Sequence, residues 1–375
     1  MAEYLTNTTD LTKVASAIRE KGGTSDSLVY PDGFVTAIQA IQTGTELKIV
    51  VSVTSGAAVT ATKGSNTVSG TSVNGTCTLT VPEAGTWSVK ATLGGETSNT
   101  KSVTFTDSYD VTLAFVSPTL NDNDWAKIRE VSDKGDGANY WSIGDSKAVT
   151  LNGTVGTLTL SNYTIYAFIL GFNHNAELEG QNRIHFQLGK TALSGGTDVA
   201  LCDSKYNSQV SATGYFSMNS SSTNSGGWNS SQMRTKICGT SLASYSGTII
   251  AVIPAALRAI IKSVTKYTDN TGASSDASAV TATTDYFFLL AEYEVFGTIS
   301  RGNPNESSKQ AQYSYYSAGN SKVKYNHSAT STAVVWWLRS PFAGSSTYFT
   351  LVIPDGTVSN DNAYYSIGFA PGFCV

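Results

Sequence analysis

The sequence predicts an α+β fold that is mainly β and is divided into two or three domains. The chain has 375 residues, which exceeds the usual size of a single domain. Its 34 glycines and its 14% share of charged residues favour short strands and turns over long solvated helices. Segments with strand-like alternation outnumber segments with helical spacing, of which the clearest in the second half covers residues 255–261.

Residues 1–45 are expected to form a short helical segment. Apolar residues recur at helical spacing over residues 10–21 and again over residues 34–41. Glycine-containing stretches at residues 22–23 and 43–45 are expected to end the two helices. Two such helices bury little apolar surface by themselves, so the pair is expected to need a partner surface.

Residues 46–107 are expected to form a small β-sandwich, because apolar and polar residues alternate in runs such as 48–53, 77–81 and 87–91. The stretch Pro-Glu-Ala-Gly-Thr-Trp at residues 82–87 resembles the turn and strand of immunoglobulin-like modules of phage and bacterial surface proteins. A single cysteine lies in this region, so no inter-sheet disulfide can form. The resemblance implies a spacer, with weak carbohydrate binding as the alternative.

Residues 108–375 contain all three histidines, so metal or acid–base chemistry would be expected there. His174 and His185 flank a charged turn, and residues 182–187 alternate as a strand does. Three acidic residues could supply a third metal ligand: Glu177, Glu179 and Asp203. Their spacing matches no metal motif, so we expect structural histidines, no metal and no other cofactor.

Known catalytic patterns are missing from the sequence. It has no GxSxG, HExxH, phosphate-binding or dinucleotide-binding glycine motif, and His327 has no evident nucleophile. Glu292 and Glu294 would share one face of a strand, where local hydrogen bonding is a better explanation than glycoside hydrolysis. The sequence therefore predicts a protein that is not an enzyme.

The four cysteines, Cys77, Cys202, Cys238 and Cys374, are far apart and include no CxxC pair. They are expected to be buried free thiols that pack as small apolar residues. A disulfide between Cys202 and Cys238 is the alternative.

Charge and hydropathy exclude some partners. The chain has 24 Lys and Arg against 28 Asp and Glu, a formal net charge of −4, and its basic residues are scattered, so nucleic acid is not an expected partner. No window approaches the roughly 18 apolar residues of a membrane helix, so membrane insertion is not expected. The first residues lack the basic and apolar pattern of a secretion signal.

Five sequence blocks, followed by a characteristic terminus, carry a family resemblance. The blocks are Gly-Gly-Trp-Asn at 226–229, Met-Arg-Thr at 233–235, residues 262–266, residues 288–295 and Trp-Trp-Leu-Arg-Ser-Pro at 336–341, and the terminus is Gly-Phe-Ala-Pro-Gly-Phe-Cys-Val at 368–375. In this order they resemble C-type-lectin-like domains of tailed phages and their bacterial hosts. Some members are variable proteins of diversity-generating retroelements, whose asparagine codons are rewritten by adenine mutagenesis. The resemblance implies such a domain over residues 108–375, with a variable region at about 342–367.

The N-terminal region resembles a second group of phage proteins. Residues 10–26, from Asp-Leu-Thr to Ser-Asp, precede Tyr-Pro-Asp-Gly-Phe at 30–34, as in the N-terminal segment of tailed-phage structural proteins. This implies a tether to other virion tail proteins and a location on the phage tail, acting outside cells at the host surface. An ordinary helical hairpin is the alternative.

The composition of residues 342–367 agrees with codon rewriting. Substituting the adenines of an AAC or AAT codon cannot produce Lys, Glu, Gln, Met or Trp, and these five residue types are missing from the window. A fixed loop rich in glycine and serine is the alternative.

The resemblance implies two sets of residues in and around this window. Ligand contact is expected from side chains that can vary without unfolding the domain: Phe342, Ser346, Thr347, Tyr348, Thr350, Thr357, Ser359, Asp361, Tyr364, Tyr365 and Ile367. The scaffold is expected to consist of flanking residues: Trp336, Trp337, Leu338, Arg339, Phe373 and Cys374. Of these, Arg339 is expected to make fixed polar bonds.

The sequence thus predicts a hypervariable receptor-binding protein whose ligand is a protein or a glycan of the bacterial surface. The family suggests a homotrimer, in which weak sites would gain from avidity. A structural baseplate or surface lectin-like protein without a variable site is the main alternative. An enzyme of the formylglycine-generating type shares the lectin-like fold but would need a reactive cysteine pair. A calcium-dependent lectin is disfavoured because Asn-Pro-Asn at 303–305 lacks a leading carboxylate.

Overall fold

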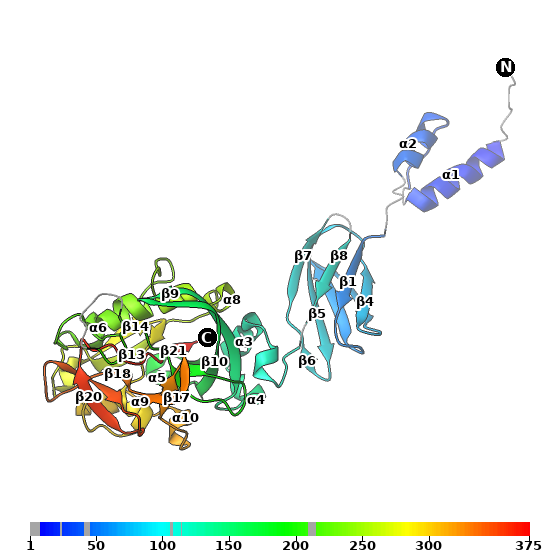
Figure 1. The fold of residues 1–375 in the computed structure, drawn as a ribbon. Helices are drawn as coiled ribbons and strands as arrows, with labels where there is room; N and C mark the ends of the chain where they lie inside the picture. Colours follow the sequence, from blue (N-terminus) through cyan, green and yellow to red (C-terminus); the bar gives the residue numbers. More distant parts are fainter. Residues whose placement is uncertain (1–7, 23–24, 41–45, 106–107, 114, 209–214) are drawn as a thin grey trace. The chain divides into compact units, whose positions relative to one another are not determined.

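The computed structural model describes residues 8–22, 25–40, 46–105, 108–113, 115–208 and 215–375. The chain divides into two compact units, Met1–Phe115 and Val116–Val375 (Figure 1). The secondary structure is mixed and mainly β, which confirms the predicted α+β class.

The first unit begins with the helices α1 (Thr8–Gly22) and α2 (Asp32–Ala40). Ala15 and Ile18 of α1 are buried with Phe34 of α2, so the two helices share a small apolar core. Three other apolar side chains of this pair stay about half exposed: Val14, Val35 and Ile38. Residues 23 and 43–45, which were predicted to help end the helices, lie outside the described residues.

The rest of the first unit is a β-sandwich. Its strands are β1 (Lys48–Ser52), β2 (Ala58–Lys63), β3 (Asn66–Thr71), β4 (Thr76–Thr80), β5 (Gly85–Leu93), β6 (Glu96–Thr97), β7 (Lys101–Phe105) and β8 (Tyr109–Thr112). One sheet has the order β4-β1-β8, and the other has the order β3-β2-β5-β6 with β7 paired to β5. Alternate residues of β5, including Trp87, Val89 and Ala91, enter the shared core, as the predicted alternation requires.

The sandwich extends beyond the predicted boundary at residue 107. Strand β8 pairs in parallel with β1, so residues 109–112 complete a sheet of the first unit. The division between the units falls after Phe115. Hydrogen bonding to β1, which is remote in sequence, decides this boundary.

The second unit combines many short helices with strands. Its helices are α3 (Trp125–Asp133), α4 (Gly137–Tyr140), α5 (Ala176–Glu179), α6 (Gly227–Ser230), α7 (Ile249–Val252), α8 (Ala255–Arg258), α9 (Glu292–Phe296) and α10 (Ser314–Ser317), with 3-10 turns at Leu120–Asp122, Ala277–Ala279 and Pro304–Ser308 and a π-helix at Met233–Cys238. Its strands are β9 (Ser146–Val155), β10 (Leu158–Phe172), β11 (Ile184–Lys190), β12 (Val199–Ala200), β13 (Val264–Asp269), β14 (Val280–Asp285), β15 (Phe287–Phe288), β16 (Lys324–Asn326), β17 (Ala329–Val334), β18 (Trp336–Pro341), β19 (Tyr348–Val352), β20 (Val358–Asn362) and β21 (Gly372–Cys374).

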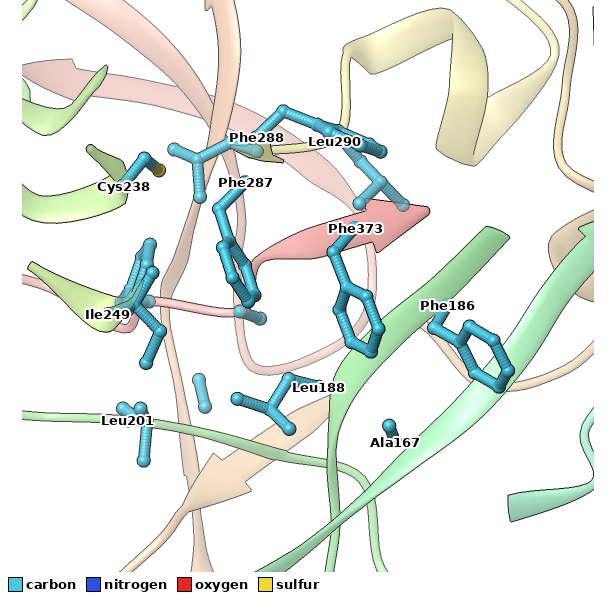
Figure 2. Close-up of a cluster of buried hydrophobic side chains, with 14 of the residues drawn as sticks. Ala167, Phe186, Leu188, Leu201, Cys238, Ile249, Phe287, Phe288, Leu290 and Phe373 are labelled. Atoms are coloured by element: carbon cyan, nitrogen blue, oxygen red, sulfur yellow. The ribbon is translucent and has the colours of Figure 1, made fainter. Parts of the chain in front are cut away.

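A five-stranded sheet with the order β15-β21-β11-β10-β9 organises this unit. Strand β21, near the end of the chain, lies inside the sheet, where Phe373 pairs with Phe186 of β11 and Phe287 of β15. The rings of these three residues form a row in the core (Figure 2). The centroid of the Phe373 ring lies 5.3 Å from that of Phe186 and 5.3 Å from that of Phe287. The other described sheets are β12-β16-β17, β13-β14 and β18-β19-β20.

Two local predictions for the second unit are wrong. The helix expected at residues 255–261 ends at Arg258, because Lys262 already forms a β-bridge with Cys374. Glu292 and Glu294 lie in helix α9 and not on a strand. The Glu294 carboxylate accepts a hydrogen bond from the backbone N–H of Ala291, as glutamates do at the start of a helix.

Helix α3 was not predicted, although its sequence has the pattern of a helix. Asp124 caps it by accepting the N–H of Lys127 at 2.7 Å. Trp125, Ile128 and Val131 recur at three-residue spacing and are buried.

Replacing Phe373 with alanine is expected to destabilise the second unit by about 3–5 kcal/mol, because the cavity would lie between two packed rings. Urea unfolding followed by tryptophan fluorescence measures this, since five of the six tryptophans belong to this unit. Phe342→Ala, at a partly exposed position, is the matched control and should cost less than about 1 kcal/mol. Equal losses for the two variants would contradict the proposed core.

Candidate ligand-binding surface

The segment 342–367 is held between two buried anchors. The first anchor is β18, in which residues 336–340 are fully buried. The second is β21, in which Phe373 and Cys374 are fully buried. β18 pairs with β19, and β19 pairs with β20, whose five residues are all partly exposed. Within the segment, β19 is mostly buried and β20 is partly exposed, so the accessible residues lie in β20 and in the connections between the strands.

Nine of the eleven predicted ligand residues reach the surface. Ser346 and Thr357 are exposed, and seven are partly exposed: Phe342, Thr347, Tyr348, Ser359, Asp361, Tyr364 and Tyr365. All six predicted scaffold residues have exposed fractions of 0%. The structure therefore separates the two predicted sets, apart from two positions.

Thr350 and Ile367 are the two exceptions, and their assignment to ligand contact is wrong. Thr350 is fully buried and donates its hydroxyl hydrogen bond to the backbone oxygen of Ser340 at 2.9 Å. Ile367 is 2% exposed and packs in the main core, where its N–H bonds to the oxygen of Phe216. Both faces of β19 are covered, so alternation along this strand does not bring every second side chain to solvent.

Four aromatic residues, Phe342, Tyr348, Tyr364 and Tyr365, are hereafter called the aromatic surface. Phe342 and Tyr348 stack with an interplanar angle of 15° and centroids 6.3 Å apart, and Tyr364 meets Tyr365 edge-on at 5.0 Å. Partial desolvation raises the pKa of Tyr365, and Tyr364, Asp361 and Tyr348 raise it further. Such a surface offers apolar faces together with hydroxyl and carboxylate groups.

Residues outside the window fix the shape of this surface. The side-chain amide of Asn224, which is 1% exposed, donates to the backbone oxygens of Ser345 and Tyr348, each at 2.8 Å. The guanidinium of Arg301 lies over the ring of Phe342 at 5.9 Å. Neither residue was predicted from the sequence, because both contacts join residues that are distant along the chain.

Glu292 holds the loop that carries Arg301. Its carboxylate accepts the N–H groups of Ser300 and Gly302, each at 2.7 Å, and also that of Arg301. Glu292 thus makes the local hydrogen bonds that were predicted for it. Its location in a helix was not predicted. Glu292 is fully buried.

Glu179, Lys266, Glu294 and Arg339 form a buried ion cluster that includes one residue of β13 and one of β18. Lys266 donates to Glu179 at 2.6 Å, to Glu294 at 3.0 Å and to the hydroxyl of Tyr313 at 2.8 Å, so its three donors are used. Arg339 binds Glu294 through both terminal nitrogens. Two cations and two carboxylates therefore balance in a site with almost no solvent exposure.

Arg339 also makes the fixed polar bonds expected of it. Its Nε donates to Thr268 Oγ1 at 2.7 Å, and Nη1 donates to the oxygen of Leu289 at 2.8 Å. Burial alone would raise the pKa of Glu294, but Arg339 and Lys266 hold it well below its ordinary value. The pair is therefore charged inside the protein.

One group of potential metal ligands adjoins the ion cluster. Ligand atoms of His174, Glu179 and Glu294 lie within 4.8 Å of one another. Lys266 pairs with both carboxylates and Arg339 pairs with Glu294, so two cations already neutralise them. Burial, followed by the charge of Lys266, lowers the pKa of His174 to about 3, so this imidazole is neutral. The grouping is explained by the protein's own cations.

The cysteines are free and buried. Cys374 lies 3.3 Å from Nδ1 of His185, but burial raises the pKa of its thiol to about 12. Cys202 and Cys238 are not bonded to each other, and burial likewise raises the pKa of each. These thiols are protonated and are therefore poor nucleophiles.

Asn303 in the Asn-Pro-Asn triplet is also a structural residue. It is fully buried, its amide donates to the oxygen of Asp276 at 2.9 Å, and its own oxygen accepts the N–H of Asn305. The triplet thus stabilises the turn at Pro304–Ser308.

Glu294→Gln is expected to destabilise the second unit by about 3–5 kcal/mol, because it leaves two buried cations with one carboxylate. The double variant Glu294→Gln/Arg339→Met should lose less stability than the sum of the losses of the two single variants, by at least about 1 kcal/mol. Urea unfolding gives the three values. Glu177→Gln, at an exposed glutamate of the same unit with no ion pair among the described residues, is the control and should cost less than about 1 kcal/mol. A Glu294→Gln loss no larger than the control would contradict the account.

Comparison with known proteins gives a family match in the C-terminal part of the chain. Among the described residues, no helix is both long and apolar enough to span a membrane. No curated protein and no solved structure matches the chain significantly. Residues 206–375, less than half of the chain, match the family described as a domain of unknown function (DUF6273). The match includes the aromatic surface and both of its anchors.

Proposed function

We propose that this chain is a receptor-binding protein that recognises a protein or glycan of a bacterial surface through the aromatic surface and its neighbours. One observation carries the proposal: nine of the eleven residues expected to contact ligand are accessible, while the residues on both sides of the window are sealed in the core. Binding surfaces that must vary need this separation, because substitutions at exposed positions leave the packing intact.

The proposal includes a C-type-lectin-like fold for the second unit and an immunoglobulin-like spacer in the first. In this view the chain is a variable protein of a diversity-generating retroelement, located on a phage tail. The exposed apolar residues of the N-terminal helices, Val14, Val35 and Ile38, support docking of that helix pair to another tail protein. A homotrimer would add avidity to weak individual sites.

A binding role agrees with the chemistry of the buried polar groups. The carboxylates of Glu292 and Glu294 are fully used by backbone N–H groups and by Arg339 and Lys266. The thiol of Cys374 is protonated and sealed from solvent. These residues stabilise the domain that presents the aromatic surface.

Sequencing the gene from a propagated phage population tests the proposal. Codon variation is expected at the nine exposed positions within 342–367, while codons 336–341 and 368–375 stay constant. Because Thr350 and Ile367 are buried, their codons are expected to stay constant among functional particles. A uniform window, or equal variation in the flanking codons, would refute the retroelement proposal.

Tyr364→Ala and Tyr365→Ala test the surface directly. Each is expected to weaken binding of the labelled full chain to susceptible bacterial cells by about tenfold or more, since central aromatic residues dominate interface energies. Flow cytometry over a panel of strains measures the binding. Tyr109→Ala, at an exposed tyrosine of the sandwich, is the matched control and should bind normally. Unchanged binding by both surface variants would place the ligand elsewhere.

A further inference from the structure

A hollow of about 550 Å³ lies in the second unit, outside the segment 342–367. Its walls come from the end of α3, from residues 181–183 before β11, from residues 261–263 before β13, and from Leu242 and Tyr286. A volume of this size suits a small organic ligand.

Three cations line the hollow against one carboxylate. Arg129 Nε lies 2.8 Å from Asp133, and Lys262 Nζ lies 2.6 Å from the same side chain. Arg183 is the third cation, and it forms no ion pair among the residues that the structure describes. The three positive charges and one negative charge leave a local excess of +2.

Arg183 is also short of hydrogen-bond acceptors. Its Nε and Nη1 atoms are buried and have no partner within the described parts of the chain. Desolvation of two of its nitrogens makes the guanidinium charge costly. Nη2 is not among the buried atoms, so an anion in the hollow would bind the group there and reduce this cost. The positive charges also affect Lys262. Burial lowers the pKa of its ammonium, and Arg129 and Arg183 lower it further, although Asp133 opposes the shift.

The remaining walls determine what kind of anion fits. Leu242, Ile261 and the aromatic ring of Tyr286 provide apolar surface, while the amides of Gln181 and Asn182 and the hydroxyl of Ser263 provide polar groups. An aromatic face beside amides and a hydroxyl matches a sugar ring, which has apolar faces and a polar rim. A bare inorganic anion would leave these walls unused.

We propose that this hollow is a second binding site, which takes a small sugar carrying an oxyanion, either a carboxylate or a phosphate ester. Arg183 and Arg129 bind the oxyanion, because guanidinium groups match carboxylate and phosphate geometry. The site is separate from the aromatic surface and does not depend on the proposed receptor-binding function. None of its lining residues lies in the window expected to vary, so its specificity is fixed.

Calorimetric titration of the full chain with D-glucuronate, D-glucose 6-phosphate and neutral D-glucose tests the proposal. Saturable binding of at least one charged sugar is expected, and glucose should give no measurable binding at the same concentrations. Binding of glucuronate alone would identify a site for acidic sugars, and binding of the phosphate ester alone would identify a site for sugar phosphates.

Arg183→Gln is expected to weaken that binding by at least about tenfold, because it removes the unpaired charge and keeps a planar polar group. Lys90→Gln makes the same charge change on an exposed face of β5 and should bind as the unaltered chain does. Tryptophan fluorescence would establish that each variant is folded, and Lys262→Gln offers a second test if Arg183→Gln is not.

Three results would overturn the proposal. These are absence of binding by either charged sugar, equal binding of neutral glucose, and unchanged affinity in folded variants of the cationic residues. Equal affinity for inorganic phosphate and glucose 6-phosphate, with no binding of glucuronate, would overturn the sugar assignment.

Discussion

The balanced, buried ion cluster is the constraint on which the second unit depends. Glu179 comes from α5, Lys266 from β13, Glu294 from α9 and Arg339 from β18, so one set of bonds joins four elements far apart in sequence. Buried charges tolerate little displacement, because each needs its partner at hydrogen-bond distance. Arg339 thus fixes the position of β18, and β18 carries the sheet that presents the aromatic surface.

In this unit, the residues that stabilise the fold are different from the residues that form the aromatic surface. The ion cluster and the row of aromatic rings around Phe373 are buried, whereas the four residues of the aromatic surface are partly exposed. Asn224 joins the two, since its side chain is buried but holds the backbone of the exposed segment. Because Asn224 binds backbone oxygens, it can hold that segment whatever side chains the segment carries.

Periodic patterns predicted the fold where one face of a strand meets the core. The alternation in β1, β4 and β5 is confirmed. The strand predicted around His185 is present as β11, but both of its faces are buried, so its burial does not alternate. The same reasoning failed at Thr350, because other segments cover both faces of β19. It also failed at Glu292 and Glu294, where a helix N-terminus and two separate polar networks replace a strand face.

The parts of the site that were missed depend on contacts between residues distant in sequence. Arg301 reaches Phe342 and Asn224 reaches Ser345 only because the chain returns to the same place, and no local pattern marks either residue. The unpaired state of Arg183 is likewise a property of its surroundings. Burial of residues 336–340 was easier to anticipate, since two adjacent tryptophans rarely stay in solvent.

The four sealed cysteines have a consequence for where this protein can be made and used. Folding requires no oxidant, because all four are free thiols, so the chain can reach its final form in a reducing compartment. Passage into an oxidising medium then changes little, since thiolates are the reactive species and burial keeps these groups protonated. The molecule is therefore indifferent to the redox state on either side of a cell envelope.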